Sequence, residues 1–259
     1  MSNKSIQYLE FKTNHFGGVL INPSSLPNET VYFANQLENS LDKWKKENFL
    51  LAWLEIPISN SRLIPVAVDL GFEFHHSSKN YLMMTYQLEE NAFIPPYATH
   101  YTGAGGVVIN EQDELLVVSE RYRGSENSPF IYKLPGGTIH EGEHIAEAVV
   151  REVKEETGVD TEFEYLICFR HWHGYKYGKS DIYFVCRLRP LNYHITRQEA
   201  EIADCRWMPI QDYLGSEQVT AFNKRIVEAT LSNKGLNTAE VDGYPNQSMH
   251  EFFMPSRST

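Results

Sequence analysis

The spacing of apolar side chains predicts two helices in the first third of the chain. Residues 29–46 repeat apolar side chains every three to four positions with charged residues between them, which is the pattern of an amphipathic helix. The repeating positions are Phe33, Leu37, Leu41 and Trp44. A second helix is expected over residues 60–70, with Pro65 in its first turn and Gly71 closing it.

Apolar runs on either side of these helices predict strands. We expect strands over residues 15–21 and 49–56, and two more within 72–86 that are joined by a polar turn at 77–80. The resulting β-α-β-α-β order describes a small α/β domain, and this order loosely resembles the acetyltransferase fold. No glycine-rich pyrophosphate loop follows a strand in residues 1–95, so we expect a structural, dimerising or specificity role for this part.

A proline-bearing link at residues 91–96 separates this part from a second series of elements. Strands are predicted over residues 103–110, 115–118, 162–170, 180–188 and 205–208. Residues 111–114 are expected to form a hairpin turn, residues 171–178 to connect two strands, and residues 217–231 to form a helix. The tail after Asn233 has no clear period, so it either forms a loop or covers a site. The predicted division is residues 1–94, 95–232 and 233–259.

Composition and charge limit the partners that we expect. The 259 residues carry a formal net charge of −11, which argues against broad electrostatic binding to nucleic acid or to an anionic membrane. The start of the chain lacks the apolar core of a signal peptide, and no apolar run is long enough to span a bilayer. Cys168, Cys186 and Cys205 lack the spacing of a zinc site or a disulfide framework, so we expect reduced thiols in a cytoplasmic compartment.

The most informative segment covers residues 137–159. Glu152, Glu155 and Glu156 are spaced i, i+3 and i+4, so a helix places the three carboxylates on one face. Crowded like charges on a helix favour a bound cation, and Mg²⁺ is the usual hard cation beside phosphates. Residues 134–137 read Leu-Pro-Gly-Gly and predict a tight loop whose backbone can approach a ligand closely.

This segment resembles the Nudix box, Gly-x5-Glu-x7-Arg-Glu-U-x-Glu-Glu-x-Gly-U, where U is an apolar residue. Besides the three glutamates, Gly137, Glu143, Arg151 and Gly158 stand at the defined positions. The resemblance implies an α/β fold, namely a Nudix α/β/α sandwich with a mixed sheet. We expect Glu143 to pair with Arg151, because an arginine–carboxylate pair would hold the loop against the helix.

Three further segments are similar to one branch of the Nudix superfamily, over roughly residues 15–214. They are residues 70–76, 96–100 and 178–183. The branch contains plant Nudix hydrolases and the animal protein encoded antisense to basic fibroblast growth factor, whose members carry a pre-Nudix domain before the Nudix domain. It also implies a homodimer.

The resemblance assigns roles to individual residues. Glu152, Glu155 and Glu156, with a carbonyl of Gly136 or Gly137, would hold Mg²⁺, and Mn²⁺ is an alternative. Glu201 matches an acidic loop residue that often completes this metal site, although a surface glutamate at a strand edge is an equal alternative. The general base would be a box glutamate or Glu201.

Substrate contacts are expected from basic and aromatic side chains near the box. The basic candidates are Arg121, Arg123, Lys133 and Lys179, and the aromatic candidates are Tyr122, Phe130, Tyr132 and Trp172. The competing interpretation is solvated charge for the first group and ordinary core for the second. The spacing of His171 and His173 suits zinc on a strand, but no third ligand accompanies them, so pocket lining is preferred.

The function implied by the resemblance is Mg²⁺-dependent hydrolysis of the pyrophosphate bond in a nucleoside diphosphate linked to another group, ADP-ribose or NADH. A nucleotide-sensing or interaction module on a Nudix fold is the alternative, and the intact glutamates of the box argue against it. An RNA-cap hydrolase is disfavoured by the acidic charge. The expected partner is a small nucleotide.

Overall fold

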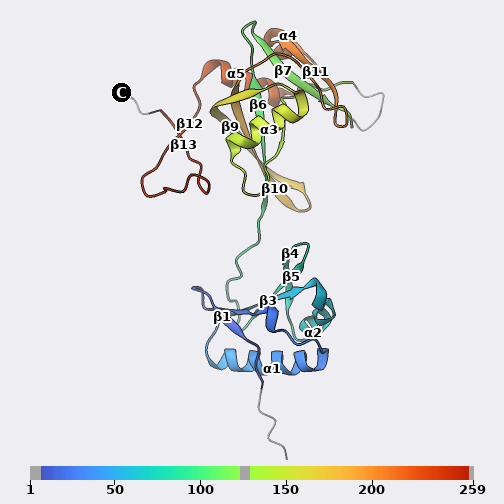
Figure 1. Cartoon of the computed structure of the whole chain (residues 1–259), viewed down its shortest axis with the longest axis vertical. Helices are drawn as coiled ribbons and strands as arrows, with labels where there is room; N and C mark the ends of the chain where they lie inside the picture. Colours follow the sequence, from blue (N-terminus) through green and yellow to red (C-terminus); the bar gives the residue numbers. More distant parts are fainter. Residues whose placement is uncertain (1–6, 123–128, 257–259) are drawn as a thin grey trace, which may run out of the picture. The chain divides into compact units, whose positions relative to one another are not determined.

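The computed structural model describes residues 7–122 and 129–256 and divides into two compact units, Met1–Ala98 and Thr99–Thr259 (Figure 1). The first unit is a five-stranded sheet in the order β1-β2-β3-β5-β4 with helices packed on it. Its strands are β1 Phe11–Thr13, β2 Gly18–Ile21, β3 Leu51–Pro57, β4 Glu73–Ser77 and β5 Tyr81–Gln87. Strands β2 and β3 are parallel, and the remaining neighbours are antiparallel.

Helix α1, Thr30–Lys46, forms where the sequence predicts an amphipathic helix, and it buries the repeating apolar positions. The predicted helix over residues 60–70 is two pieces instead: a 3-10 helix, Ile58–Leu63, and α2, Ile64–Asp69. Pro65 lies at the start of α2, where a missing backbone N–H costs no helical hydrogen bond. A further short 3-10 helix covers Pro23–Ser25.

The core of this unit provides a test of the packing. Leu37 in α1 is fully buried, whereas Val31 in the same helix is exposed (69% of its surface). We expect Leu37→Ala to lower the free energy of unfolding by about 2–5 kcal/mol, because it removes buried methyl groups and leaves a cavity. Val31→Ala should change it by less than about 0.5 kcal/mol. Urea unfolding of the full chain measures both, and equal effects would contradict the packing.

The second unit is an α/β/α sandwich around a four-stranded mixed sheet in the order β8-β6-β10-β9. These strands are β6 His100–Val108, β8 Gly136–Thr138, β9 Thr161–Lys176 and β10 Lys179–Pro190. Strands β6 and β10 are parallel, and the other two pairings are antiparallel. Strands β7, Glu114–Glu120, and β11, Ile202–Pro209, form a separate antiparallel pair.

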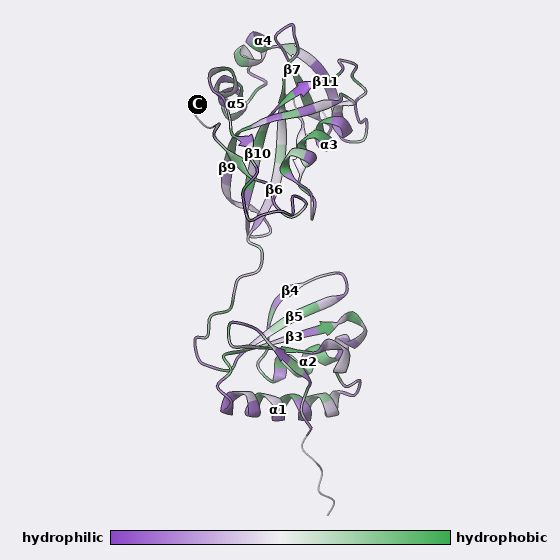
Figure 2. Ribbon diagram, turned by 60° about the vertical axis from the view of Figure 1, so that its left-hand side comes forward, coloured by the Kyte–Doolittle hydropathy of each residue, from purple (hydrophilic) through white to green (hydrophobic). Residues whose placement is uncertain are grey.

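Successive side chains of β6 point to opposite faces of this sheet, and each face has its own hydrophobic core. Ala104 and Val108 pack with Val149 and Val153 of α3, Ile145–Thr157. Val107 packs into the second core, which also takes residues from α4, Ile210–Gly215, and α5, Ala221–Ser232. Figure 2 shows hydrophilic and hydrophobic residues alternating along α1 and α3, as packing on one face requires.

Two boundaries in this unit differ from the predictions. Residues 171–178 are not a connecting loop, because β9 runs to Lys176 and β10 begins at Lys179. The turn between them uses Tyr177 and Gly178, both at positive φ (50° and 72°), which suits a two-residue hairpin. The predicted helix 217–231 begins only at Ala221, since Thr220 caps α5 by accepting a hydrogen bond from the Asn223 N–H at 3.3 Å.

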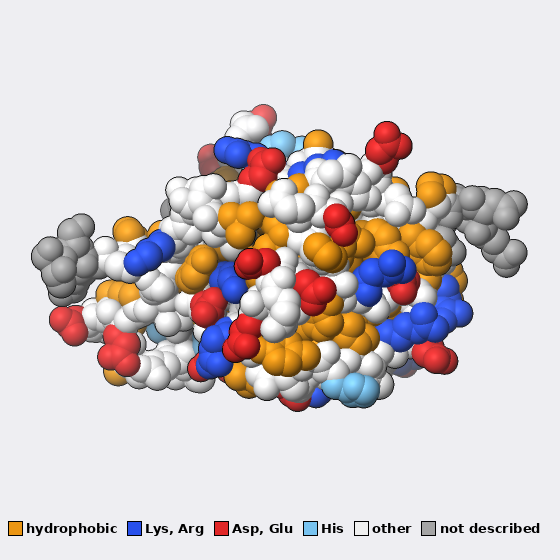
Figure 3. Space-filling view, turned by 90° about the horizontal axis from the view of Figure 1, so that it is seen from above, with side chains coloured by type: hydrophobic (Ala, Val, Ile, Leu, Met, Phe, Trp, Pro, Cys, Tyr) orange, Lys and Arg blue, Asp and Glu red, His pale blue; other side chains and the backbone are white. Residues whose placement is uncertain are grey.

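The tail after α5 contains a two-residue antiparallel pair, β12 Asn237–Thr238 with β13 Phe253–Met254. Leu236 exchanges backbone hydrogen bonds with Leu166 of β9 and ties the tail to the sheet. Within the described residues, none of the helices has the length and apolarity to cross a bilayer. On the face shown in Figure 3, acidic and basic side chains are interspersed among apolar ones.

Candidate active site

Helix α3 fixes the carboxylates of the motif relative to a glycine loop. Its apolar stripe is buried in the core, and Gly158 ends it in the left-handed conformation (φ 76°). The loop before it lies directly on β6, where Gly106 N–H donates to the Pro135 carbonyl at 2.9 Å. A Cβ on Gly136 would lie 2.3 Å from the Ala104 carbonyl oxygen, so this close approach requires glycine.

Two of the three motif carboxylates contact this loop. The Glu156 side chain is buried and accepts a hydrogen bond from the Gly136 N–H at 2.8 Å. The Glu152 carboxylate packs on Gly137, since a Cβ there would lie 2.5 Å from its Oε2. Helix and loop are therefore joined by the carboxylates themselves.

Burial raises the pKa of Glu156 to about 7. The Lys133 ammonium and the Gly136 N–H oppose this shift, while the carboxylates of Glu152 and Glu120 reinforce it. The carboxylates of Glu156, Glu152 and Glu120 thus repel one another near the loop. This excess of negative charge is what a bound cation would offset.

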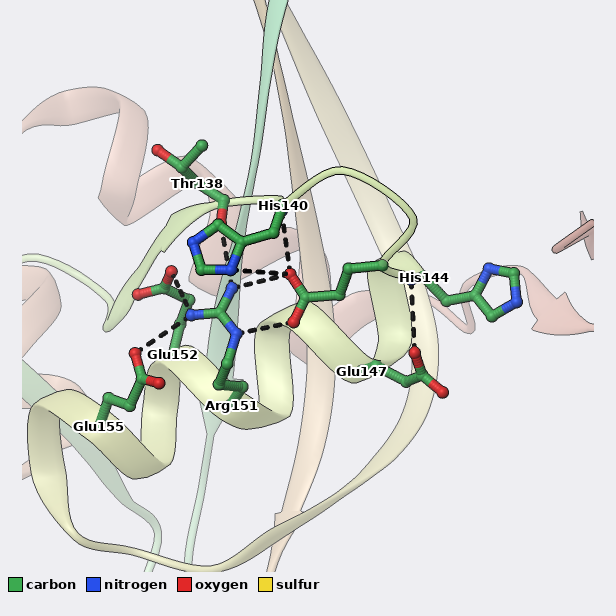
Figure 4. Close-up of polar contacts among 8 residues, drawn as sticks. Thr138, His140, His144, Glu147, Arg151, Glu152 and Glu155 are labelled. Carbon is green, nitrogen blue, oxygen red and sulfur yellow. Dashed lines mark hydrogen bonds and ion pairs between the residues drawn. The ribbon is translucent and has the colours of Figure 1, made fainter. Parts of the chain in front are cut away.

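Arg151 organises the remaining carboxylates (Figure 4). Its Nε and Nη2 donate to the two oxygens of Glu143 at 2.6 and 2.8 Å, so the predicted ion pair is present and bidentate. Its Nη1 donates to Glu152 at 2.8 Å and to Glu155 at 3.1 Å, and Nη2 also reaches the Thr138 carbonyl. One guanidinium therefore fixes two motif carboxylates and the end of β8.

The Glu143–Arg151 pair is shielded, with side-chain exposures of 15% and 23%. Hydrogen bonding to Arg151 lowers the pKa of Glu143 to about 2, against a smaller opposing effect of burial. Glu143 is therefore ionised throughout the physiological range. Its contacts are those of a positioning residue.

The glycine loop borders a cleft of about 740 Å³, which lies in the size range of small-molecule sites. The cleft is formed by the β6, β8 and β10 side of the sheet, the end of β9 and the start of α5. Its polar and aromatic lining residues include Glu120, Lys133, Arg170, Tyr175, Lys176, Asp181, Tyr183, Phe222 and Asn223. The carboxylates of helix α3 contact the same loop from the side opposite the cleft.

The residues suggested for substrate contact have different positions. Lys133 lines the cleft and pairs with Glu120 at 2.6 Å. Tyr132 is buried, and its hydroxyl donates to Asp204 at 2.7 Å. Trp172 is half exposed on β9, beside the Arg170 guanidinium at 5.1 Å.

Neither Tyr132 nor Trp172 is among the residues that line the cleft, and the same holds for the remaining candidates that the structure describes. Arg121 is joined to Glu201 through a backbone hydrogen bond of 2.7 Å, and the Glu201 side chain is exposed. Tyr122 is exposed, and neither Phe130 nor Lys179 lines the cleft. Arg123 falls outside the described residues.

Sequence reasoning did not single out several residues that line the cleft. They are Glu120, Arg170, Asp181, Tyr183 and Phe222. They come from β7, β9, β10 and α5, and the pairing of β9 with β10 brings Arg170 beside Tyr183. The sequence did offer one signal, because Asp181 and Tyr183 lie inside the family-like segment 178–183.

The donor set at the loop suits a hard divalent cation in kind, since it consists of carboxylate and backbone oxygens. Among the described residues, no three His, Cys, Asp or Glu side chains already surround a common point. The Arg151 guanidinium engages Glu152 and Glu155. The residues that would hold a cation are Glu152, Glu155 and Glu156 with the loop carbonyls.

The tail contributes a contact to α3. Both oxygens of Glu251 accept hydrogen bonds from the first turn of the helix, from Ile145 N–H at 2.8 Å and Ala146 N–H at 3.1 Å. We expect Glu251→Ala to lower the free energy of unfolding by about 1 kcal/mol, because two helix N–H groups lose an anionic acceptor. Glu240→Ala, an exposed tail glutamate, is the control in thermal unfolding. An equal effect of the two would contradict a capping role.

Family models match both units of the chain. The model of the Nudix hydrolase domain matches residues 9–88, and the model of the NUDIX domain matches residues 99–230. Among solved structures, the chain is similar to a NUDIX hydrolase from Nitrosomonas europaea, with 23% identity, a TM-score of 0.46 and coverage of 55% of this chain and 98% of that one.

Curated relatives cover most of the chain. Nudix hydrolase 8 of Arabidopsis thaliana is 40% identical over 238 residues, which are 89% of this chain, and the chain spans 64% of that protein. Nudix hydrolase 2 of the same plant is 42% identical, with coverage of 77% and 71%. Nucleoside diphosphate-linked moiety X motif 6 of Homo sapiens is 33% identical, with coverage of 86% and 72%.

Proposed function

The chain belongs to the Nudix hydrolase family, and from this premise we propose that it cleaves the pyrophosphate bond of a nucleoside diphosphate linked to another group, with ADP-ribose or NADH as substrate. The observation that carries the proposal is the contact of Glu152 and Glu156 with Gly137 and Gly136, in a loop that borders a cleft of about 740 Å³. A pyrophosphate in this cleft would lie against the glycine loop, which the carboxylates of α3 contact.

Glu152, Glu155 and Glu156, with the Gly136 or Gly137 carbonyl, would hold Mg²⁺ (or Mn²⁺). When bound, the cation supplies charge compensation for the substrate phosphates and acidifies a nearby water. Water would attack one phosphorus, the bridging P–O bond would break, and the leaving phosphate would keep the bridging oxygen. A carboxylate accepts the proton of the water; the candidates are the three box glutamates and Glu201.

Arg151, Glu143 and Lys133 have positioning or binding roles. Arg151 holds Glu152 and Glu155 while Glu143 holds Arg151, so the carboxylates are oriented before substrate arrives. Lys133 lines the cleft and can contact an outer phosphate, in competition with its partner Glu120. Lys133 is thus a cationic side chain of the cleft lining beside the loop.

The proposal extends to the setting of the protein. Cys168, Cys186 and Cys205 are free thiols, and burial raises the pKa of each, which suits a reducing cytoplasm. We also propose a homodimer, as the related branch implies, and a structural or specificity role for the first unit. Size-exclusion chromatography with light scattering measures the oligomeric state directly.

A nucleotide panel tests the proposed function. Wild type and Glu155→Gln are incubated with ADP-ribose, NADH, NAD⁺, coenzyme A, diadenosine polyphosphates and oxidised dNTPs, with and without Mg²⁺. We expect wild type to hydrolyse ADP-ribose or NADH only with Mg²⁺, and the variant to lose this activity. Tight binding of one nucleotide without turnover would replace the proposal by a nucleotide sensor. Activity unchanged in Glu155→Gln would exclude the assigned carboxylates.

A further inference from the structure

One row of residues crosses the sheet from the glycine loop to β9. Thr138 pairs with Gly103, Gly103 with Tyr183, and Tyr183 in turn with Arg170. Residues paired across strands face the same side, and all four of these line the cleft together with the start of α5. Three strand spacings of about 4.8 Å separate Thr138 from Arg170, or about 14 Å. The cleft therefore has a second polar end, well away from the glycine loop.

Arg170 and Asp181 form this second end. Asp181 is only 5% exposed, and its Oδ2 accepts a hydrogen bond from Arg170 Nη2 at 2.5 Å. Aromatic rings surround the guanidinium, with Tyr183 at 5.4 Å and Phe222 at 5.7 Å from its Cζ. Phe222 keeps 40% of its surface exposed at the start of α5, so it offers a ring to a ligand.

The Arg170 Nε–H is buried without a hydrogen-bond partner. Six buried side-chain atoms of the described residues share this property, and Arg170 is the one residue among them that lines the cleft. A buried donor left unpaired is destabilising, so such a group beside a ligand cleft indicates a missing partner. Because the Nε atom itself is buried, contacts to a bound molecule fall to the other N–H groups of the Arg170 guanidinium, whose side chain is partly exposed.

The pair also limits the chemistry of that molecule. Asp181 balances the charge of Arg170, so the site favours a neutral group over a second phosphate. Arg170 supplies N–H donors, and the carboxylate of Asp181, engaged through Oδ2, supplies an acceptor beside them. The complementary ligand edge carries an acceptor next to an N–H donor on a planar ring. An adenine has such an edge, and so does the carboxamide of a nicotinamide.

We infer that Arg170, Asp181 and Phe222 form a specificity subsite that reads an acceptor–donor edge of the substrate's aromatic group while the pyrophosphate lies at the glycine loop. This inference rests on the proposed function and deepens it. Arg170 and Asp181 contact the edge, and Phe222 stacks on the ring. Tyr183 forms the floor between the two ends, against Gly105, where a Cβ would lie 2.3 Å from its hydroxyl.

Paired substrates that differ only at this edge test the inference. ADP-ribose is compared with its analogue whose base is unsubstituted purine, which carries a hydrogen in place of the amine of adenine. NADH is compared with reduced 3-acetylpyridine adenine dinucleotide, whose ketone lacks the amide N–H. We expect wild type, with Mg²⁺, to show kcat/KM lower by at least about tenfold for one analogue than for its parent. The pair that discriminates identifies which ring occupies the subsite.

Three variants assign the discrimination to these residues. Asp181→Asn and Arg170→Lys should reduce the parent-to-analogue ratio to less than about threefold, since Asn offers a donor where Asp offers only acceptors. Phe222→Ala should lower kcat/KM for parent and analogue alike and keep the ratio. Arg189→Lys, in the exposed ion pair with Glu162 on the same two strands, is the matched control and should change neither. If Asp181→Asn does not fold, Arg170→Lys carries the test.

Two results would overturn the inference and leave the proposed function standing. In the first, wild type hydrolyses all four compounds with equal kcat/KM. In the second, the parent-to-analogue ratio of kcat/KM is unchanged in both Asp181→Asn and Arg170→Lys. If wild type hydrolyses none of them, the proposed function fails. In that case, the binding of the same four compounds is measured by calorimetry, which tests the subsite independently of hydrolysis. A tenfold weaker Kd for one analogue, lost in Arg170→Lys, supports the subsite, and equal Kd values overturn it.

Discussion

Glu156→Gln is expected to lower kcat/KM by about 100- to 1000-fold while making the metal-free protein more stable above pH 7. The loss of activity follows from removing a charged oxygen at the loop, by analogy with single charge-stabilising groups worth about 3–4 kcal/mol. The gain in stability follows from burial, because the folded protein holds a carboxylate whose pKa is raised to about 7.

The pH dependence of that gain has a defined sign. The unfolded chain releases the Glu156 proton near its ordinary pKa of 4.5, whereas the folded chain keeps it until about 7. The wild type therefore loses stability as pH rises from 4.5 through 7, by an amount on the order of 3 kcal/mol. Glutamine does not ionise, so the variant has no such loss. In buffer containing a chelator, the free energy of unfolding of Glu156→Gln should therefore exceed that of wild type at pH 8 and not at pH 5.

Glu147→Gln provides the matched control for this prediction. Glu147 lies on the same helix and is exposed near its start. We expect it to change neither kcat/KM nor the pH dependence of unfolding. If Glu156→Gln loses activity and stability together at every pH, its effect is structural and the assigned role of the carboxylate is wrong.

Glu143→Gln should lower the free energy of unfolding by about 3 kcal/mol at pH 7, the second largest effect that we expect. The pKa of Glu143 falls from 4.5 to about 2 because Arg151 binds the ionised form, and both side chains are largely shielded from solvent. A depressed carboxylate pKa contributes stability that is present above pH 4.5 and is lost as pH falls through 2. The difference between variant and wild type should therefore shrink between pH 4.5 and 2.

Chemical unfolding across this pH range measures the effect, with Glu162→Gln as control. Glu162 also pairs with an arginine, but the pair is more than half exposed, so its loss should cost less than about 1 kcal/mol. A pH-independent difference for Glu143→Gln would mean that the charge of the pair does not stabilise the fold.

Local signals in the sequence predicted the parts of the fold that depend on neighbouring residues. The box helix has buried Val149 and Val153 at helical spacing and Gly158 in the left-handed conformation at its end. The Glu143–Arg151 pair lies within the same short segment, so its prediction needed no knowledge of distant parts of the chain. The same holds for α1 of the first unit.

The misplaced boundary between β9 and β10 has a non-local cause. Residues 171–176 lack strong strand propensity at Gly174 (φ 68°), yet they extend β9 because Trp172 pairs with Asp181 of β10. The cleft residues Arg170 and Asp181 were missed for the same reason. Their proximity depends on strand register, which residue spacing in the sequence does not specify.

The account's central claim is that water cleaves a pyrophosphate bond at the glycine loop, and isotope labelling tests it most directly. Wild type is incubated with Mg²⁺ and ADP-ribose or NADH in ¹⁸O-labelled water, and the products are analysed by mass spectrometry. We predict AMP with ribose 5-phosphate from ADP-ribose, or AMP with reduced nicotinamide mononucleotide from NADH. One product of the pair should carry a single ¹⁸O on its phosphate, and a chelator should abolish the reaction. Release of the free base or free nicotinamide, or no cleavage of either compound, would contradict the account.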